Sequence, residues 1–362
     1  MRIDSLTFFR FLAASIVVIF HYGKNTALAN IAPGFLTAGP EMVSFFFVLS
    51  GFVMMIAYWD REFDTARYFQ ARLVRIVPTY YLAFVAALFL ETVAFGKRAV
   101  VFNALFLQAW FPPYPLSING PSWSLSVEMF LYLSFPMILW MLKPKRISSH
   151  TLFGIAFFLW FFSQFVLMNL LNSSFYKPAP SIPSDLIFYF PLSHFSTFFL
   201  GVAGGYFYLN RKHQRIQHDW LLKLAILATC ISIFLTISFE GKFVNLLGMQ
   251  IPFAAGTFTP LFLALILLVS LAQDTFQANW FKHRFFSLLG DASYALYIFQ
   301  RPFHQFFDAY VFPFLKLPGD LAFYFYFSCL ILFSIGVFLF FEKPLKRLLR
   351  PKSIDYKLIK PA

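Results

Sequence analysis

The chain has 362 residues, of which 59% are hydrophobic and only 12% are charged. A soluble core of this length does not need 55 Phe residues with so few charges, so composition argues against a soluble globular protein. Repeated apolar runs close to the thickness of a bilayer favour a polytopic helical membrane protein. The net charge of +13 does not indicate nucleic-acid binding, because we expect the cations to gather at one membrane face.

The apolar runs predict an all-α fold with about ten transmembrane helices plus one or two re-entrant or broken helices. The predicted spans are 7–22, 41–58, 77–95, 123–142, 151–171, 187–209, 221–239, 256–273, 287–311 and 320–341. Residues 99–111 are too few to cross a bilayer, and residues 249–260 contain two prolines and a glycine, so both segments are expected to be broken pieces. We expect one integral membrane domain over 1–342 and a basic cytoplasmic tail over 343–362.

The distribution of Lys and Arg orients these spans. A cytosolic amino terminus puts most of the cations in inner segments, as the positive-inside rule requires. Making 99–111 a true span would move the basic run 143–146 outside and invert everything after it. We therefore expect a multi-pass protein of the cell inner membrane, surrounded by membrane lipids, with both termini cytoplasmic.

The first span carries two polar residues that share one helical face. Arg10 and His21 are eleven residues apart, which is three turns plus roughly 20°. Along the axis they lie roughly 16 Å apart, about half the thickness of the bilayer core. A permanent cation at one depth and a titratable imidazole at another predict a polar path through the membrane.

Two further arginines join Arg10 at the inner mouth of this path. Arg72 and Arg75 are three residues apart and therefore on one helical face, and we expect Pro78 to lie close to the helix start. The three guanidinium groups suit a multiply charged phosphate ligand. The alternative is that each is a positive-inside anchor for lipid headgroups.

A carboxylate in the fourth span is predicted to lie in the outer half of the membrane, near His21. Glu128 is about five residues inside the span, and a carboxylate at such a place normally faces a cavity or a partner. Ser124, Glu128 and Tyr132 are spaced by four and share a face. We expect Glu128 to orient His21 as a general base, with Ser124 and Tyr132 as hydrogen-bond partners. Ser124 can also be explained as a helix cap.

The run FFFVLSGF places Ser50 in the middle of the second span, where we expect it to support the polar path. His194, Arg301 and His304 also fall in or near spans, but no spacing singles them out. No cluster of His, Cys or carboxylates has the spacing of a metal site, so no metal is expected.

These motifs, in order and over nearly the whole chain, resemble the acyltransferase-3 family of integral membrane O-acyltransferases. The motifs are Arg10-x10-His21, FFFVLSGF, RLVRIVP at 72–78, WSLSVEMFLY at 123–132, GDASYALYIFQRP at 290–302 and FEKP at 341–344. The resemblance is to the stand-alone form, which has no appended hydrolase-like domain.

The resemblance implies ten spans and the transfer of an acyl group, usually acetyl from cytosolic acetyl-CoA, to a hydroxyl of an extracytoplasmic or lipid-linked carbohydrate. Acetyl-CoA would be the donor co-substrate and an exopolysaccharide or lipopolysaccharide the acceptor. By the same resemblance Arg10, Arg72 and Arg75 would engage coenzyme A, and His21 would be the catalytic base.

One departure from the family pattern is Gln300, where relatives often have His. Glutamine cannot act as an acid or base, so it is left out of the catalytic set. The alternative function is a membrane transporter or flippase for a polysaccharide precursor, which would also have broken helices and intramembrane charges.

Overall fold

The structure is a computed structural model that describes residues 4–91, 95–145, 147–211, 219–272 and 283–349. All the regular elements in these residues are helical, so the all-α prediction is confirmed. In chain order they are α1 (Asp4–Val18), η1 (Ile19–Gly23), α2 (Ala27–Ile31), α3 (Pro33–Leu36), α4 (Gly39–Tyr58), α5 (Thr65–Leu90), α6 (Lys97–Ala104), η2 (Gly120–Ser122), α7 (Trp123–Leu142), η3 (Lys143–Lys145), α8 (Ser149–Leu171), α9 (Ile182–Phe188), η4 (Pro191–His194), α10 (Phe195–Arg211), α11 (Asp219–Ser238), α12 (Glu240–Leu247), η5 (Phe253–Ala255), α13 (Thr259–Leu271), α15 (Arg284–Tyr310), α16 (Phe312–Leu315), α17 (Gly319–Gly336), η6 (Val337–Glu342) and α18 (Lys343–Leu348).

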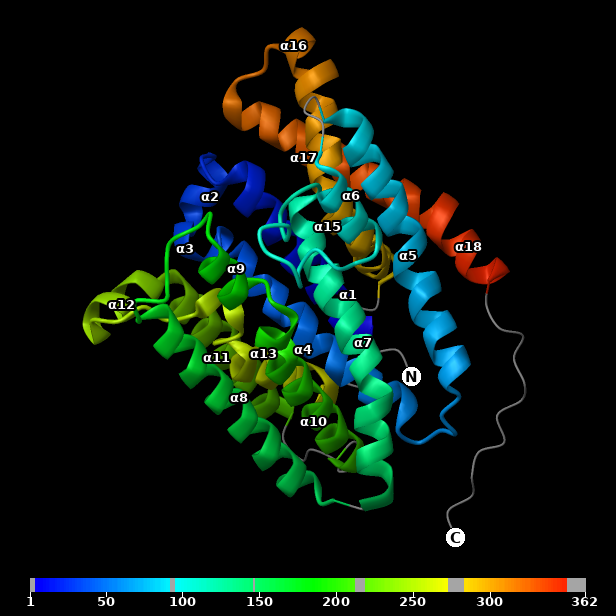
Figure 1. The fold of residues 1–362 in the computed structure, drawn as a ribbon, viewed down its shortest axis with the longest axis vertical. Helices are drawn as coiled ribbons and strands as arrows, with labels where there is room; N and C mark the ends of the chain where they lie inside the picture. Colours follow the sequence, from blue (N-terminus) through cyan, green and yellow to red (C-terminus); the bar gives the residue numbers. More distant parts are fainter. Residues whose placement is uncertain (1–3, 92–94, 146, 212–218, 273–282, 350–362) are drawn as a thin grey trace.

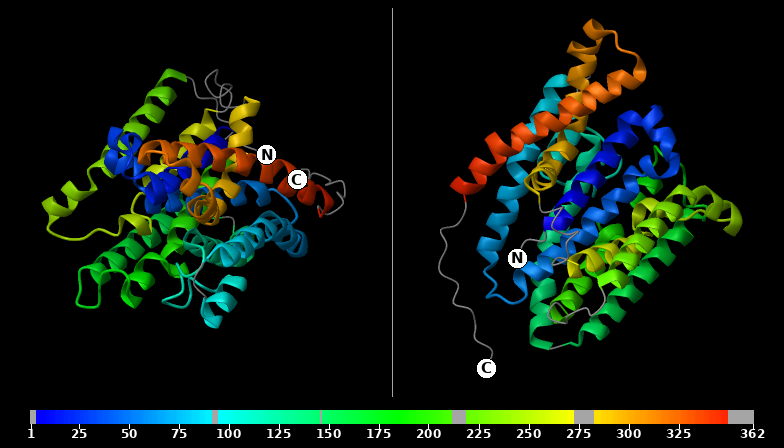
Figure 2. Two further views of the ribbon diagram at one scale, coloured as in Figure 1. Left: turned by 90° about the horizontal axis from the view of Figure 1, so that it is seen from above. Right: turned by 180° about the vertical axis from the view of Figure 1, so that it is seen from behind.

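Eight helical stretches in the described residues are long and apolar enough to cross a membrane. The other two predicted spans correspond to α13, which is apolar but shorter, and to α15, which carries several charges. The long helices pack side by side, and α2, α3 and α16 lie at the end of the bundle opposite to the C-terminal end of α7 (Figures 1 and 2). The chain is therefore organised as the polytopic helical bundle that its composition predicts.

The segment predicted to be re-entrant does not cross the bundle. Its helix α6 has only 8 residues, and an irregular stretch follows it up to η2. Three amide side chains of this segment are buried, at 0% exposure for Asn103 and Gln108 and 2% for Asn119. Their amide nitrogens donate to protein oxygens, for example from Asn119 to the carbonyl of Ile298 at 2.9 Å. Irregular backbone is tolerated in a membrane protein when protein surrounds it in this way.

One expected helix boundary is wrong. Pro78 lies well inside α5, which begins at Thr65, rather than near a helix start. Asp64 caps this helix by accepting a hydrogen bond from the backbone N–H of Arg67, and it also forms an ion pair with the Arg67 side chain at 3.0 Å. The polar first turns before the apolar run hid this start in the sequence. Arg72 and Arg75 are consequently fixed within a long helix.

Helices α4 and α10 pack backbone to backbone, through glycines. A Cβ added to Gly201 would come within 2.1 Å of the Val48 carbonyl oxygen, and one added to Gly51 within 2.2 Å of the Phe198 carbonyl oxygen. Gly201 and Gly205 are four residues apart, so they present one small-residue face to α4. The two backbones touch because these positions have no side chain.

Helices α1 and α15 run parallel and in register. At one end, the backbone of Thr7 lies against Gly290, where an added Cβ would be 2.1 Å from the Thr7 carbonyl oxygen. At the other end, the ring of Tyr22 stacks on His304 with centroids 4.1 Å apart. The two contacts are separated by 15 residues on α1 with η1 and by 14 on α15. The position of each α1 residue along the helix axis can therefore be matched to a residue of α15.

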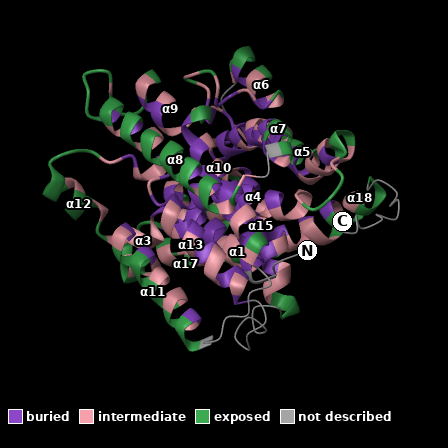
Figure 3. Cartoon of the chain, turned by 90° about the horizontal axis from the view of Figure 1, so that it is seen from below, coloured by how far each residue is buried: buried purple, intermediate pink, exposed green. Residues whose placement is uncertain are grey.

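The peripheral helices α8 and α11 expose large apolar side chains. On α8 these include Phe158 at 65% and Phe161 at 58% exposure, and on α11 Leu224 at 54%. Exposed residues follow the outer surfaces of both helices (Figure 3). A contiguous surface of this kind suits lipid rather than water.

We predict that Gly201→Ala lowers the stability of the folded protein in detergent. The new methyl group has to displace the Val48 carbonyl, and such overpacking costs about 1–3 kcal/mol. Thermal unfolding of the purified protein measures the change. The matched control is Gly154→Ala in α8, where nothing lies within 4 Å of the added Cβ and stability should not fall. Equal effects of the two substitutions would refute this account of the α4–α10 contact.

Candidate active site

A cavity of about 500 Å³ lies among α1, α4, α5, α7, α15 and the η6–α18 segment. We call it the arginine cavity, because Arg10, Arg72 and Arg75 all line it. It is also lined by Ser50, Ser124, Glu128 and Tyr132. Seven of the eight site residues predicted from the sequence therefore meet in one place; the eighth, His21, does not line this cavity.

The three arginines differ in how they are held. Arg72 donates to the hydroxyl of Tyr58 at 3.2 Å, and its guanidinium lies 5.6 Å from the ring centroids of Tyr58 and Tyr132. The Nε of Arg72 is buried without a hydrogen-bond partner. Among the described residues, Arg10 and Arg75 have no hydrogen bond or ion pair from their guanidinium groups. The cavity thus holds several donors that are free to bind an anion.

Glu128 belongs with these arginines. Its carboxylate accepts a short hydrogen bond from the hydroxyl of Tyr132, one helical turn away. Glu128 and Arg75 are both among the groups that act electrostatically on Arg10. The carboxylate therefore offsets part of the positive charge of the cavity.

The expected pairing of Glu128 with His21 is not formed among the described residues. The prediction measured the depth of Glu128 from the start of α7 and assumed that this helix start lies at the outer membrane surface. Residues 97–122 lie before that helix and are partly buried, and Glu128 lines the arginine cavity instead.

Ser124 and Ser50 both face the cavity, by contacts that the sequence does not reveal. The Oγ of Ser124 lies 2.8 Å from the hydroxyl of Tyr297 and 3.0 Å from the carbonyl oxygen of Pro121. No side-chain cap hydrogen bond forms at the start of α7, so the cap explanation does not hold. Ser50 donates to the sulfur of Met54 at 3.7 Å.

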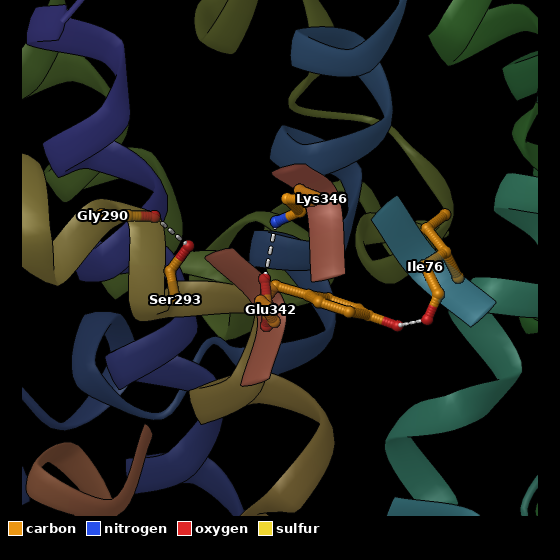
Figure 4. A network of polar contacts seen from close by, with 6 residues as sticks. Ile76, Gly290, Ser293, Glu342 and Lys346 are labelled. Atoms are coloured by element: carbon orange, nitrogen blue, oxygen red, sulfur yellow. Dashed lines mark hydrogen bonds and ion pairs between the residues drawn. The ribbon is translucent and has the colours of Figure 1, made fainter. Parts of the chain in front are cut away.

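An ion pair of the C-terminal segment also lines the cavity. Glu342 is 3% exposed and forms an ion pair with Lys346 at 2.7 Å (Figure 4). Both residues line the cavity, as does Asp291 of α15. The sequence contains the FEKP motif, to whose residues no role was assigned. The i, i+4 spacing of Glu342 and Lys346 was the feature that could have predicted this ion pair.

His21 lies in η1, at the opposite end of the first span from Arg10. It is exposed, and the charged groups that act on it are Arg301 and Lys24. Its neighbours form what we call the His21 cluster: His21, Tyr22, Glu91, Arg301 and His304. Within it, Arg301 forms an ion pair with Glu91 at 3.2 Å, and His304 lies 2.8 Å from the carboxylate of Asp308.

Gln300 and His194 are turned into the protein. The Nε2 of Gln300 donates to the carbonyl oxygen of Tyr297 at 2.7 Å, and Gln300 is fully buried. His194 is also fully buried, with Nε2 3.0 Å from the carbonyl oxygen of Phe188. Both side chains are buried among other residues, and neither lines the arginine cavity.

In the part of the chain that the structure describes, no group of three or more His, Cys, Asp or Glu side chains could hold a metal ion. The chemistry that the described side chains offer is anion binding at one level and proton transfer at another. Arginines suit phosphate or carboxylate ligands, and an exposed imidazole suits a hydroxyl substrate.

Comparison with known proteins gives two relatives, both named as acyl- or acetyltransferases. The chain is 32% identical over 171 residues to Acyltransferase MdmB of Streptomyces mycarofaciens, covering 43% of each chain. It is 27% identical over 186 residues to Putative acetyltransferase ORF330 of Acidianus two-tailed virus, covering 51% of each. The aligned part thus spans about half the length of these relatives, and no solved structure matches the chain.

The family comparison covers far more of the chain. The profile of the acyltransferase-3 family, described as an acyltransferase domain, matches residues 3–343. This range includes every residue of the arginine cavity except Lys346, and all of the His21 cluster. The multi-pass helical bundle, the matched range and the two relatives lead to one conclusion: the chain belongs to the acyltransferase-3 family of membrane proteins.

Proposed function

We propose that this protein is a membrane O-acyltransferase that moves an acyl group, most simply acetyl, from acyl-CoA to a hydroxyl of a cell-surface or lipid-linked glycan. The observation that carries the proposal is the gathering of Arg10, Arg72 and Arg75 around one cavity with guanidinium donors left free. Membership of an acyltransferase family supports the reaction class.

In this proposal the arginine cavity opens to the cytosol and holds the donor. Coenzyme A is anionic at its nucleotide end and has a long, thin, neutral arm. The three arginines bind phosphate oxygens, and the carboxylate of Glu128, which accepts a hydrogen bond from Tyr132, offsets part of their charge. The arm extends along α1 and α15 toward the His21 cluster, roughly 16 Å from Arg10.

The transfer itself takes place at His21. Its imidazole takes the proton of the acceptor hydroxyl as the oxygen attacks the thioester carbonyl carbon. The carbon–sulfur bond then breaks, and the imidazolium of His21 returns the proton to the departing thiolate of coenzyme A. With both termini in the cytosol, His21 lies on the outer side of the inner membrane, where a glycan acceptor is accessible.

We predict that Arg75→Gln weakens acetyl-CoA binding by about 10- to 100-fold, since a hydrogen bond to a charged group contributes about 1.5–3 kcal/mol. Calorimetric titration of the purified protein with acetyl-CoA measures this. Arg67→Gln is the matched control, because Arg67 lies on the same helix but pairs with Asp64 outside the cavity. Unchanged affinity in Arg75→Gln would remove the cavity from donor binding.

We predict that His21→Ala abolishes acyl transfer while leaving acetyl-CoA affinity within twofold of the wild type, because the base is distant from the donor's phosphates. The assay is release of free coenzyme A by membranes that contain the acceptor, with mass spectrometry of O-acetyl groups on surface glycans. His150→Ala, at an exposed position on α8, serves as the control. A transporter would move its substrate without consuming acetyl-CoA, and normal acetylation in His21→Ala would contradict the catalytic assignment.

A further inference from the structure

The face of α15 leads from the arginine cavity to Arg301. Tyr297 lines the cavity and lies 2.8 Å from the Oγ of Ser124, and Arg301 follows it four residues later on the same helical face. The Nη1 of Arg301 lies 4.0 Å from where a Cβ of Gly120 would be, so the guanidinium is near the loop that leads into α7. A ligand arm that extended along this face past Tyr297 would reach the level of Arg301.

The register between α1 and α15 brings Arg301 to the level of His21. The contacts Thr7–Gly290 and Tyr22–His304 fix that register at both ends. Interpolated between them, His21 and Arg301 differ by about two residues, or about 3 Å along the helix axes. In agreement, Arg301 is one of two charged groups that act electrostatically on His21, the other being Lys24.

Arg301 is held on one edge of its guanidinium and is free on the other. Its Nη2 donates to Oε2 of Glu91 at 3.2 Å, and the side-chain amide of Gln305 donates to the same oxygen at 2.8 Å. In the described residues, the remaining guanidinium nitrogens of Arg301 have no hydrogen-bond partner. The side chain of Arg301 is 30% exposed. Glu91 and Gln305 thus fix the position of a cation whose other donors stay available.

We propose that Arg301 stabilises the oxyanion of the tetrahedral intermediate formed beside His21, with Glu91 as the residue that positions it. This inference rests on the proposed acyltransferase function. When the acceptor oxygen attacks the thioester carbon, the carbonyl oxygen becomes negatively charged and His21 holds the proton. The free N–H groups of Arg301 donate to that oxygen, and the charge returns to the carbonyl bond as the thiolate of coenzyme A leaves.

In this arrangement the two sets of cations have different roles. Arg10, Arg72 and Arg75 bind charge that is present in the substrate before and after reaction. Arg301 binds charge that exists only during reaction, so its contribution should appear in kcat rather than in donor affinity. An Arg301–Glu91 pair that only stabilises the fold would not produce this division.

The experiment compares Arg301→Gln, Arg301→Lys and Glu91→Gln with the wild type in the coenzyme A release assay. Loss of one oxyanion donor lowers kcat by about 10²- to 10³-fold, and we expect that loss in Arg301→Gln with KM for acetyl-CoA within threefold of wild type. Arg301→Lys should recover part of the rate, and Glu91→Gln should lose less than Arg301→Gln. Arg98→Gln, an exposed cation on α6, is the matched control and should leave both constants unchanged.

Chemical rescue distinguishes a catalytic from a structural role. In Arg301→Ala, added guanidinium ion should restore part of kcat in proportion to its concentration, without changing the thermal stability of the protein. Near-wild-type kcat in Arg301→Gln, with His21→Ala inactive, would overturn the inference and leave the proposed function standing. A loss of both acetyl-CoA affinity and thermal stability in the Arg301 variants, with no rescue by guanidinium ion, would also overturn it. Normal transfer by His21→Ala would instead contradict the proposed function itself.

Discussion

The parallel packing of α1 against α15 is the constraint on which both levels of the site depend. Glycine at position 290 lets the backbone of Thr7 approach closely, and the Tyr22–His304 stack holds the other end. Between these contacts neither helix can slide by a turn without losing one of them. Arg10 is thereby fixed at the level of Ser293 and Tyr294, and His21 at the level of Arg301. The spacing of the two levels follows from helix rise, and interactions with a ligand are not required to maintain it.

The glycine contact between α4 and α10 has a similar consequence on the other side of the cavity. Because Gly51 and Gly201 bring the two backbones together, backbone contact sets the position of α4 beside α10. Ser50 and Met54 of this helix line the arginine cavity. The wall opposite α15 is therefore formed by a helix whose position is set by backbone contact rather than by adaptable side chains, which favours a preformed cavity.

The sequence predicted the helical class, the order of the spans and which candidate residues share a helical face, because those features depend on local rules. Apolar length defines spans, and i, i+3 or i, i+4 spacing defines helical faces, so Arg72 with Arg75 and Glu128 with Tyr132 were correctly grouped. Depth was harder to predict. Counting from expected span ends put Glu128 beside His21 and Pro78 at a helix start, and both depended on where the chain enters the bilayer. In the structure α5 begins at Thr65, before its apolar run, and a partly buried segment precedes α7, so counting from the apolar runs misplaced both residues.

The pairing of charges in the arginine cavity could not be predicted either, and it explains how four cations remain in one buried place. Arg10, Arg72, Arg75 and Lys346 line the cavity together with three carboxylates, those of Glu128, Asp291 and Glu342. Four cations alone in a low-dielectric site would repel one another and lose hydration, at a cost of several kcal/mol per ion. Interspersed carboxylates lower that cost while leaving a net positive charge. In Lys346 the ion pair with Glu342 uses the ammonium group directly, whereas Arg10 and Arg75 keep their donors free. The residues that compensate charge and those that can bind an anion are thus different members of one cavity, and this division offsets the charge without using the donors of Arg10 and Arg75.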